Sequence, residues 1–191
     1  MIQDIGQSVY HVEYLPEAPA DQDVVFLFQR GKIFAFKDEA KQLHFATYES
    51  VKDQMNEEHL QYLFGIDEKR YYLYDGEMHL QHFDFEKMGY VRIMQDMKEA
   101  FAAMTAYHLY TWYSSHRFCG KCGEQMAHSD QERVLICPDC GNRVYPGISP
   151  AVIIGVTRGD DILVTRYADR EYKGVALLAG FCEIGESGED T

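Results

Sequence analysis

Four of the five cysteines occur in two closely spaced pairs, "CGKC" at Cys119–Cys122 and "CPDC" at Cys137–Cys140. A Cys-x2-Cys pair fits on a tight turn whose backbone amides point at the two sulfurs. The turn-forming residues that this requires are present in and beside both pairs, as Gly120, Gly123, Pro138 and Gly141. Four thiolates in two such pairs are typical of a tetrahedral zinc site, and the 14-residue spacer between the pairs is one residue shorter than the usual range. We therefore predict that Cys119, Cys122, Cys137 and Cys140 bind one Zn²⁺ per chain.

The predicted zinc is structural, because four sulfur ligands leave no coordination position for water or substrate. Two disulfides, or free cysteines in a core, are the alternatives, and a reducing cytosol disfavours the first. His116 and His128 flank the cluster and could replace a ligand, although solvated histidines are expected there. The remaining cysteine, Cys182, is expected to be a small apolar core residue.

The charge of the chain argues against a partner that is held by its phosphate backbone. The formal net charge is −13, whereas surfaces that bind nucleic acids are basic. Within the cysteine region, Lys121 and Arg133 are outnumbered by four acidic residues, which are Glu124, Asp130, Glu132 and Asp139. A small phosphate-containing substrate remains possible through bound metal ions.

Residues 1–90 have the pattern of a β-rich domain of α+β class. Two alternating apolar runs surround Arg30-Gly31-Lys32, which predicts a hairpin. A second hairpin is predicted around Asp75-Gly76. Between them, the spacing of Leu60, Leu63 and Phe64 predicts a short helix, with Asn56 as N-cap and Gly65 as its end.

Residues 91–116 predict one long linking helix. Its large apolar residues recur at steps of three and four, and they are Met94, Met97, Phe101, Met104 and Trp112. A stripe of this kind faces the protein core in most helices. A flexible docking surface made of methionines is the alternative.

The segment after the cysteines starts a new sheet. Two apolar runs, from Ala151 and from Ile162, are joined by a turn at Gly159-Asp160-Asp161. The sequence has no apolar run long enough for a membrane helix and no signal peptide at its start, so we expect a cytoplasmic protein.

The combination of "FCGKCG", "CPDCGNRVYPGISPAVI" and "LLAGFCEIGE" resembles the NADH pyrophosphatase branch of the Nudix hydrolases. The resemblance implies an α+β protein with an incomplete Nudix α/β/α sandwich. The implied domains are a β-rich N-terminal domain (1–90), a linking helix (91–116), a zinc ribbon (117–146) and the start of the Nudix domain (147–191).

The Nudix box of this family runs Gly-x5-Glu-x7-Arg-Glu and continues with further glutamates. Gly180 and Glu186 match its first two positions, and the arginine and glutamates that follow the spacer are absent from the 191 residues. In the family these glutamates share one face of a helix and hold Mg²⁺ or Mn²⁺ against the pyrophosphate. We therefore expect the 191-residue chain to be inactive as an enzyme.

By resemblance, several residues of this chain have individual roles. The backbone carbonyl of Ala179 would bind Mg²⁺ or Mn²⁺, Phe181 would stack on the substrate ring, and Glu186 would orient the loop of the Nudix box. Glu132 and Tyr145 would contact the substrate. A solvated surface charge is the alternative for Glu132, and a packing aromatic is the alternative for Tyr145.

The implied function is hydrolysis of the pyrophosphate of NADH or NAD to mononucleotides, with NAD-capped RNA as a further candidate substrate. The resemblance also implies a homodimer. The strands that contain Val152, Ile153, Ile154, Ile162 and Val164 would lack a covering helix within these residues and would invite pairing with another chain. A non-catalytic zinc-ribbon binding or scaffold protein is the alternative from another functional class.

Overall fold

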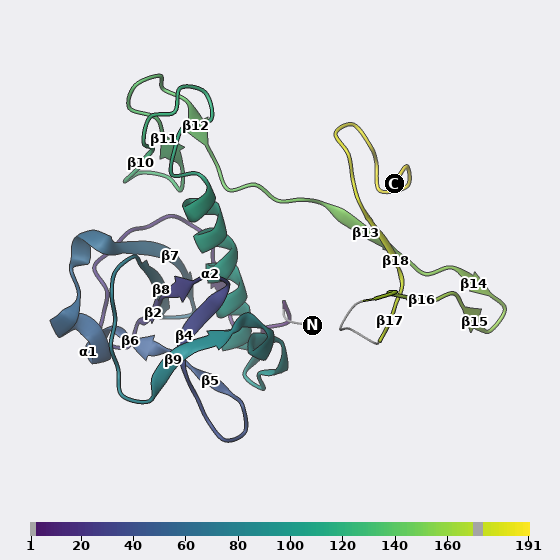
Figure 1. Cartoon of the computed structure of the whole chain (residues 1–191), viewed down its shortest axis with the longest axis horizontal. Coiled ribbons are helices and arrows are strands. Elements are labelled where there is room, and N and C mark those ends of the chain that lie inside the picture. Colours follow the sequence, from purple (N-terminus) through teal and green to yellow (C-terminus); the bar gives the residue numbers. More distant parts are fainter. Residues whose placement is uncertain (1–2, 170–173) are drawn as a thin grey trace. The chain divides into compact units, whose positions relative to one another are not determined.

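The computed structural model describes residues 3–169 and 174–191. Two compact units make up the chain, Met1–Pro146 and Gly147–Thr191 (Figure 1). The division into 1–90, 91–116 and 117–146 lies inside the first unit, and this finer division stays a prediction. No helix among the described residues is both long and apolar enough to cross a membrane.

Two β-sheets form the main part of the first unit. The first has the strand order β1-β7-β8-β2-β6, in which β2 and β8 are parallel and the other neighbours are antiparallel. Its strands are β1 (Tyr10–His11), β7 (Leu60–Ile66), β8 (Lys69–Tyr74), β2 (Val24–Phe26) and β6 (Ala46–Thr47). The second is antiparallel and consists of β3 (Phe28–Gln29), β4 (Lys32–Lys37), β5 (Leu43–His44) and β9 (Phe83–Lys87).

The hairpin predicted around Arg30-Gly31-Lys32 is confirmed. Strands β3 and β4 pair with Phe28 opposite Ile33 and Gln29 opposite Lys32. The turn residues Arg30 and Gly31 have φ values of 48° and 76°. Two successive left-handed residues match the right-handed twist of the flanking strands, and Gly31 reaches this conformation without steric penalty.

The helix predicted over Leu60, Leu63 and Phe64 is wrong. These residues lie in β7, which pairs with β8 in the middle of the sheet. Asn56 does cap a turn, but of a 3-10 helix, η2 (Glu57–His59), where its side chain accepts a hydrogen bond from the Glu58 amide. Gly65 does not end an element, since it lies inside β7 opposite Arg70. A short apolar run does not separate helix from strand by its period alone, and the aromatic residues of this run favour the strand.

The second predicted hairpin, around Asp75-Gly76, is also wrong. Strand β8 ends at Tyr74 and pairs with β7 and β2, whereas β9 begins at Phe83 and pairs with β4. Asp75 therefore marks the point where the chain leaves one sheet for the other. The hairpin that does form joins β7 to β8, and its turn contains Asp67 with φ 54°.

The long helix is present as α2 (Met97–Ser115), which begins at Met97 rather than at Val91. Asp96 sets the start, because its side chain accepts a hydrogen bond from the Glu99 amide at 3.0 Å. Val91 belongs to the preceding 3-10 segment η3 (Met88–Ile93). Two shorter helical elements occur earlier, α1 (Tyr48–Val51) and the 3-10 segment η1 (Lys52–Gln54).

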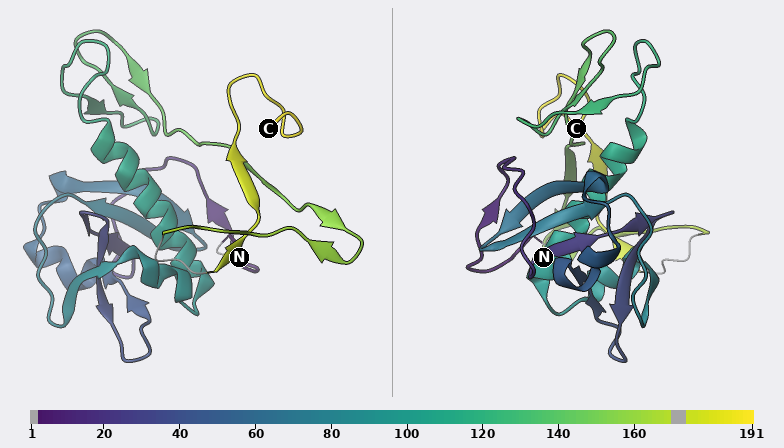
Figure 2. Two further views of the ribbon diagram at one scale, coloured as in Figure 1. Left: turned by 45° about the vertical axis from the view of Figure 1, so that its right-hand side comes forward. Right: turned by 90° about the vertical axis from the view of Figure 1, so that its left-hand side faces the viewer.

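The helix α2 packs on β7 and β8 (Figure 2). The predicted core-facing stripe is confirmed in part, since Met94 is buried and Phe101 and Met104 pack against the main core. The most buried side chains of the helix are small ones, led by Ala102, Ala103 and Ala106 at 0% exposure. Small side chains let the helix axis approach the aromatic face of the sheets closely, where Phe28 contacts Tyr107 and Tyr110.

The second unit consists of three antiparallel strand pairs, and its described residues contain no helix. The pairs are β13 (Ala151–Ile154) with β18 (Leu178–Phe181), β14 (Thr157–Arg158) with β15 (Asp161–Ile162), and β16 (Thr165–Arg166) with β17 (Val175–Ala176). The predicted turn is confirmed between β14 and β15, where Gly159 has φ 59°. Apolar side chains of these strands are exposed, including Ile153 at 72% and Ile162 at 52%.

Candidate metal centre

The four predicted ligands lie on two turns of equivalent backbone geometry. In the first, the amides of Cys119 and Gly123 donate to the carbonyls of Glu124 and Cys119 at 2.7 and 2.8 Å. In the second, the amides of Cys137 and Gly141 donate to the carbonyls of Asn142 and Cys137 at 2.8 and 3.0 Å. Gly123 and Gly141 have φ values of 83° and 69°, in the left-handed region that favours glycine. The glycine that follows each Cys-x2-Cys pair is therefore required by the turn.

A small antiparallel sheet holds the second turn. Its strands are β10 (Ala127–His128), β11 (Leu135–Ile136) and β12 (Arg143–Val144), with β11 in the centre. Strand β11 leads directly into Cys137, and β12 leaves the same turn after Asn142. The first turn is closed by a bridge between Phe118 and Gln125.

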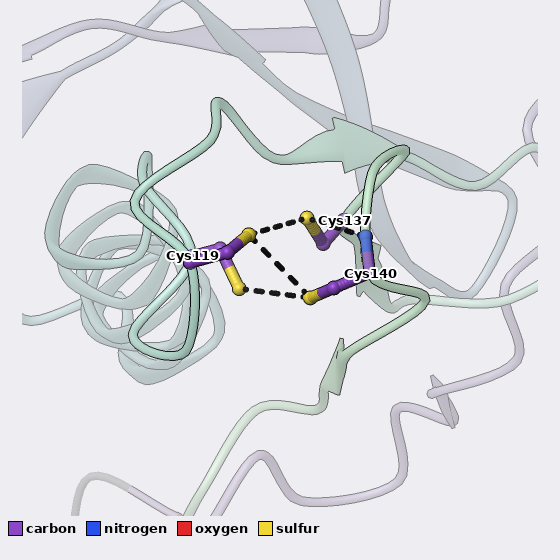
Figure 3. Close-up of side chains that lie close together, drawn as sticks. Cys119, Cys137 and Cys140 are labelled. Atoms are coloured by element: carbon purple, nitrogen blue, oxygen red, sulfur yellow. Dashed lines mark hydrogen bonds between the residues drawn. The ribbon is translucent and has the colours of Figure 1, made fainter.

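The four sulfur atoms converge on one point (Figure 3). All four lie within 4.8 Å of one another. The Sγ of Cys140 is 3.6 Å from that of Cys119 and 3.5 Å from that of Cys122, and the sulfurs of Cys122 and Cys137 are 3.4 Å apart. Tetrahedral Zn–S bonds of about 2.3 Å place sulfurs about 3.8 Å apart, so the cluster is close to the size that zinc needs.

Backbone amides donate to two of the four sulfurs, and among the four thiols they favour the charged form of Cys119. The neighbouring sulfurs instead raise the pKa of Cys122 and of Cys140. The amide of Lys121 donates to the Cys119 sulfur at 3.4 Å, and the amide of Cys140 donates to the Cys137 sulfur at 3.5 Å. The amide of Cys122 and that of Lys121 lower the pKa of Cys119 to about 6. Hydrogen bonds to a thiolate favour ionisation, which is the form that binds a metal.

The disulfide alternative for the cysteines finds no support in the described residues. All five cysteines are free, and the sulfurs within the cluster are too far apart for disulfide bonds. His116 bonds through Nδ1 to the Trp112 carbonyl at 2.8 Å, and His128 stacks on Tyr113 with ring centroids 4.9 Å apart. Neither histidine belongs to the sulfur cluster.

A small apolar cluster lies behind the sulfur site. Trp112, Met126 and Leu135 are buried together with Cys119 and Cys137. Trp112 comes from the last turns of α2, so this cluster joins the end of the helix to the metal-binding turns. The cluster is too small to stabilise the ribbon by burial alone, and this is the usual situation in which a structural metal contributes the folding free energy.

Two of the predicted substrate-binding residues lie side by side in the segment that contains the four cysteines. The hydroxyl of Tyr145 donates to Glu132 Oε2 at 3.1 Å, and Arg143 Nη1 is 3.6 Å from Glu132 Oε1. Both Glu132 and Tyr145 are exposed, Tyr145 at 51%. Tyr145 is therefore not a core aromatic, and both side chains are accessible to a ligand.

Arg133 is a contact residue that the sequence analysis missed. Its guanidinium donates to the carbonyl of Val12 at 3.2 Å and to the carbonyl of Leu63, and it lies over the Tyr14 ring at 5.6 Å. Tyr14 in turn donates to the carbonyl of Ser129 at 3.2 Å. These contacts fix the ribbon to the N-terminal sheet, and no local sequence pattern marks them because the partners are distant along the chain.

The remaining predicted site residues lie in the second unit. Ala179 in β18 is opposite Ile153, and Phe181 ends the same strand with 72% of its surface exposed. Glu186 Oε2 accepts hydrogen bonds from the Glu183 amide at 2.8 Å and from the Thr191 hydroxyl at 3.1 Å. Their roles toward substrate and metal stay predictions. Cys182 is only half-buried and lies outside the clusters of buried residues, so the expected core position is not found.

The described residues contain no convergent group of three or more carboxylates that could hold Mg²⁺ or Mn²⁺ by side chains alone. Among them, the four cysteines are the only group of three or more His, Cys, Asp or Glu side chains whose ligand atoms converge. Glu183 and Glu186 do not form such a group, since the carboxylate of Glu186 is engaged with the loop backbone.

Comparison with known proteins supports the resemblance predicted from the sequence. Residues 114–145 match the NADH pyrophosphatase zinc ribbon domain, so the resemblance is confirmed for this segment. The match contains the four cysteines, Glu132 and Tyr145.

Similar proteins occur in several Pseudomonas species under the name NAD-capped RNA hydrolase NudC. The protein of P. fluorescens strain Pf0-1 is 51% identical over 81 residues, which cover 42% of this chain and 29% of that protein. The protein of P. putida strain F1 is 52% identical over 81 residues, and that of P. aeruginosa strain PAO1 is 51% identical over 79 residues, with 28% of its length covered. The match thus spans less than a third of the length of these relatives.

Proposed function

We propose that this chain is part of a zinc-containing hydrolase that cuts the pyrophosphate of NADH, NAD or NAD-capped RNA into mononucleotides. The observation that carries the proposal is the four-thiolate centre inside a segment that matches the NADH pyrophosphatase zinc ribbon domain. The relatives that share this segment are named NAD-capped RNA hydrolases. In this proposal the zinc is structural and holds the ribbon, and the chemistry belongs to a Nudix domain that begins at Gly147.

The residues of this chain contribute binding and positioning rather than the reaction itself. Glu132 and Tyr145 form a hydrogen-bonded pair at the surface of the ribbon, where a carboxylate and a phenol can together recognise hydroxyl and amino groups of a nucleotide. Phe181 offers an exposed ring for stacking. Divalent ions, when bound by glutamates of a complete Nudix box, would neutralise the pyrophosphate and activate water.

A direct test is the hydrolysis of NADH by the protein as its gene encodes it, with Mn²⁺ or Mg²⁺ present, followed by chromatography of the products. We expect AMP and reduced nicotinamide mononucleotide, and no free nicotinamide. Glu132→Gln should raise KM more than it lowers kcat, because the residue binds substrate and does not act on phosphorus. Absence of metal-dependent hydrolysis of NADH, NAD and NAD-capped RNA would contradict the proposal and favour a non-catalytic ribbon protein.

We also propose that a polypeptide of these 191 residues has no hydrolase activity of its own. Its described residues contain no convergent carboxylates for the divalent ions. The matched comparison is the same assay with the isolated polypeptide, loaded with zinc and supplied with Mn²⁺. Measurable turnover above a metal-free blank would show that these 191 residues do hydrolyse the substrate, which contradicts this proposal.

A further inference from the structure

The first unit contains a cavity of about 470 Å³, which we name the junction cavity. It lies where three segments meet: the last turns of α2, the strand ends around His59 and Asp75, and the ribbon around Gln125 and His128. Neither the four cysteines nor Glu132 and Tyr145 line it, so it is separate from the sites described above. Its volume falls in the usual range for small-molecule sites, about 300 to 1,000 Å³.

Flat aromatic surfaces form much of its wall. Tyr113 and His128 stack at 4.9 Å with 17° between their planes, so helix and ribbon each contribute one ring to a stacked pair. Phe28 and Tyr110 contact each other at 5.2 Å on another part of the wall. Stacked rings of this kind suit a planar aromatic guest, because any π-face can continue the stack.

The polar groups of the wall are partly fixed and partly available. Two hydrogen bonds fix His59 and Asp75 to each other. His59 Nδ1 is 2.8 Å from the Asp75 carbonyl, and the Asp75 amide donates to the His59 carbonyl at 3.0 Å. The side chains of Arg117 and Gln125 make no hydrogen bond to other described residues. The cavity thus offers both donors and acceptors around its aromatic wall.

We propose that the junction cavity binds a planar heteroaromatic molecule of nucleoside size. The aromatic wall accepts the ring, Arg117 and Gln125 donate to ring acceptors, and the carboxylates of Glu58 and Asp75 accept from amino or hydroxyl groups. This inference goes beyond the proposed function and does not depend on it, since the cavity holds none of the predicted substrate-binding residues.

The charges and the ligand atoms of the wall exclude other guests. The wall contains the carboxylates of Glu58 and Asp75 and one guanidinium, that of Arg117. This excess of negative charge disfavours binding of a polyanion such as a triphosphate. Desolvation by the surrounding groups lowers the pKa of His128, and the opposing effect of Asp75 is smaller, so the site favours the neutral form of this ring. A metal ion is disfavoured because no three of the described imidazoles and carboxylates converge here.

Two side chains belong both to the apolar cluster behind the sulfurs and to the wall of the cavity. Met126 and Leu135 pack behind the sulfur cluster and also line the cavity. Removal of zinc should therefore disorder the ribbon side of the cavity and abolish binding, whereas the α2 and strand sides remain.

Isothermal titration of the zinc-loaded chain with adenosine, guanosine, cytidine and uridine tests the proposal. We expect saturable binding of at least one of them at millimolar concentration or below, which zinc removal abolishes. His128→Ala and Arg117→Gln should each weaken that binding about tenfold, the size expected for one lost stack or charged hydrogen bond. The matched controls are His108→Ala and Arg92→Gln, two exposed residues outside the cavity, and they should bind as the wild type does.

Three results would overturn the proposal. The first is absence of saturable binding of all four nucleosides to the folded, zinc-loaded chain. The second is binding that His128→Ala and Arg117→Gln leave unchanged. The third is AMP binding more than about tenfold tighter than adenosine, since a phosphate-driven site contradicts the charge balance of the wall. NADH hydrolysis by the protein is a separate readout, so failure here and failure of the proposed function can be told apart.

Discussion

At the scale of single residues, the metal centre depends on four sulfurs of unequal exposure. Cys119 and Cys137 are buried, whereas Cys122 is exposed. The buried pair also belongs to the apolar cluster with Trp112. Loss of a buried sulfur therefore removes a ligand and leaves a defect in the packing.

We predict that Cys137→Ser abolishes stoichiometric zinc binding, because three thiolates and a weakly basic hydroxyl do not complete the tetrahedral site. Zinc content after dialysis, measured by inductively coupled plasma mass spectrometry, should fall from one per chain to well below one. Cys182→Ser is the matched control, since Cys182 lies outside the sulfur cluster. Retention of a full zinc equivalent by the Cys137 variant would rule out the four-sulfur site.

Arg133 gives a second prediction at the residue scale, and it concerns the stability of the contact between the ribbon and the N-terminal sheet. Arg133→Gln removes two charge-assisted hydrogen bonds to the carbonyls of Val12 and Leu63. The free energy of unfolding should fall by about 2 to 4 kcal/mol, since a hydrogen bond to a charged group contributes about 1.5 to 3 kcal/mol. Urea denaturation measures this, and Arg92→Gln at an exposed position should change it by less than about 0.5 kcal/mol. Equal stability of the two variants would show that the ribbon does not depend on this anchor.

At the scale of elements, features that depend on neighbouring residues could be predicted from the sequence, and features that depend on distant partners could not. The convergence of the four cysteines could be predicted because each Cys-x2-Cys turn is closed by its own backbone, and the hairpin at Gly31 could be predicted for the same reason. Strand β7 was missed because its apolar run has no distinctive period, and its strand character comes from pairing with β1 and β8. Arg133 was missed because its partners lie far away along the chain.

The start of α2 gives a prediction at this scale. Asp96→Ala removes the side-chain oxygen that accepts from the Glu99 amide, and should lower the free energy of unfolding by about 1 kcal/mol. Asp96→Asn keeps the acceptor and serves as the matched variant, with a smaller loss. Thermal unfolding followed by circular dichroism distinguishes the two. If both variants lose the same stability, charge rather than capping determines the effect.

At the scale of the whole molecule, zinc is expected to stabilise one part of the first unit selectively. The sheets around β7 and β8 have their own core of buried aromatic and aliphatic residues, whereas the ribbon has only the small cluster behind the sulfurs. Chelation should therefore remove hydrogen-exchange protection from β10, β11 and β12 and leave that of β2, β7 and β8. Loss of protection in all six strands would show that zinc stabilises the whole unit.

The exposed apolar strands of the second unit lead to a prediction of assembly. Ile153 is 72% exposed and Ile154 44%, in a strand that pairs only with β18 among the described residues. Exposed apolar strands favour association, and we predict a homodimer. Light scattering after size-exclusion chromatography should give twice the chain mass, and Ile153→Lys should shift the protein toward monomer. A monomer at all concentrations would contradict this prediction.

The helix α2 also sets a rotational constraint on the first unit. It runs without interruption for 19 residues from the Asp96 cap to a point just before the first metal-binding turn, and it contacts β7 and β8 along the way. One residue inserted between Ala106 and Trp112 would turn everything after it by about 100° and advance it by about 1.5 Å. Arg133 would then no longer reach the carbonyls of Val12 and Leu63, although every side chain remained present. The number of residues in this helix is thus a determinant of the fold in its own right.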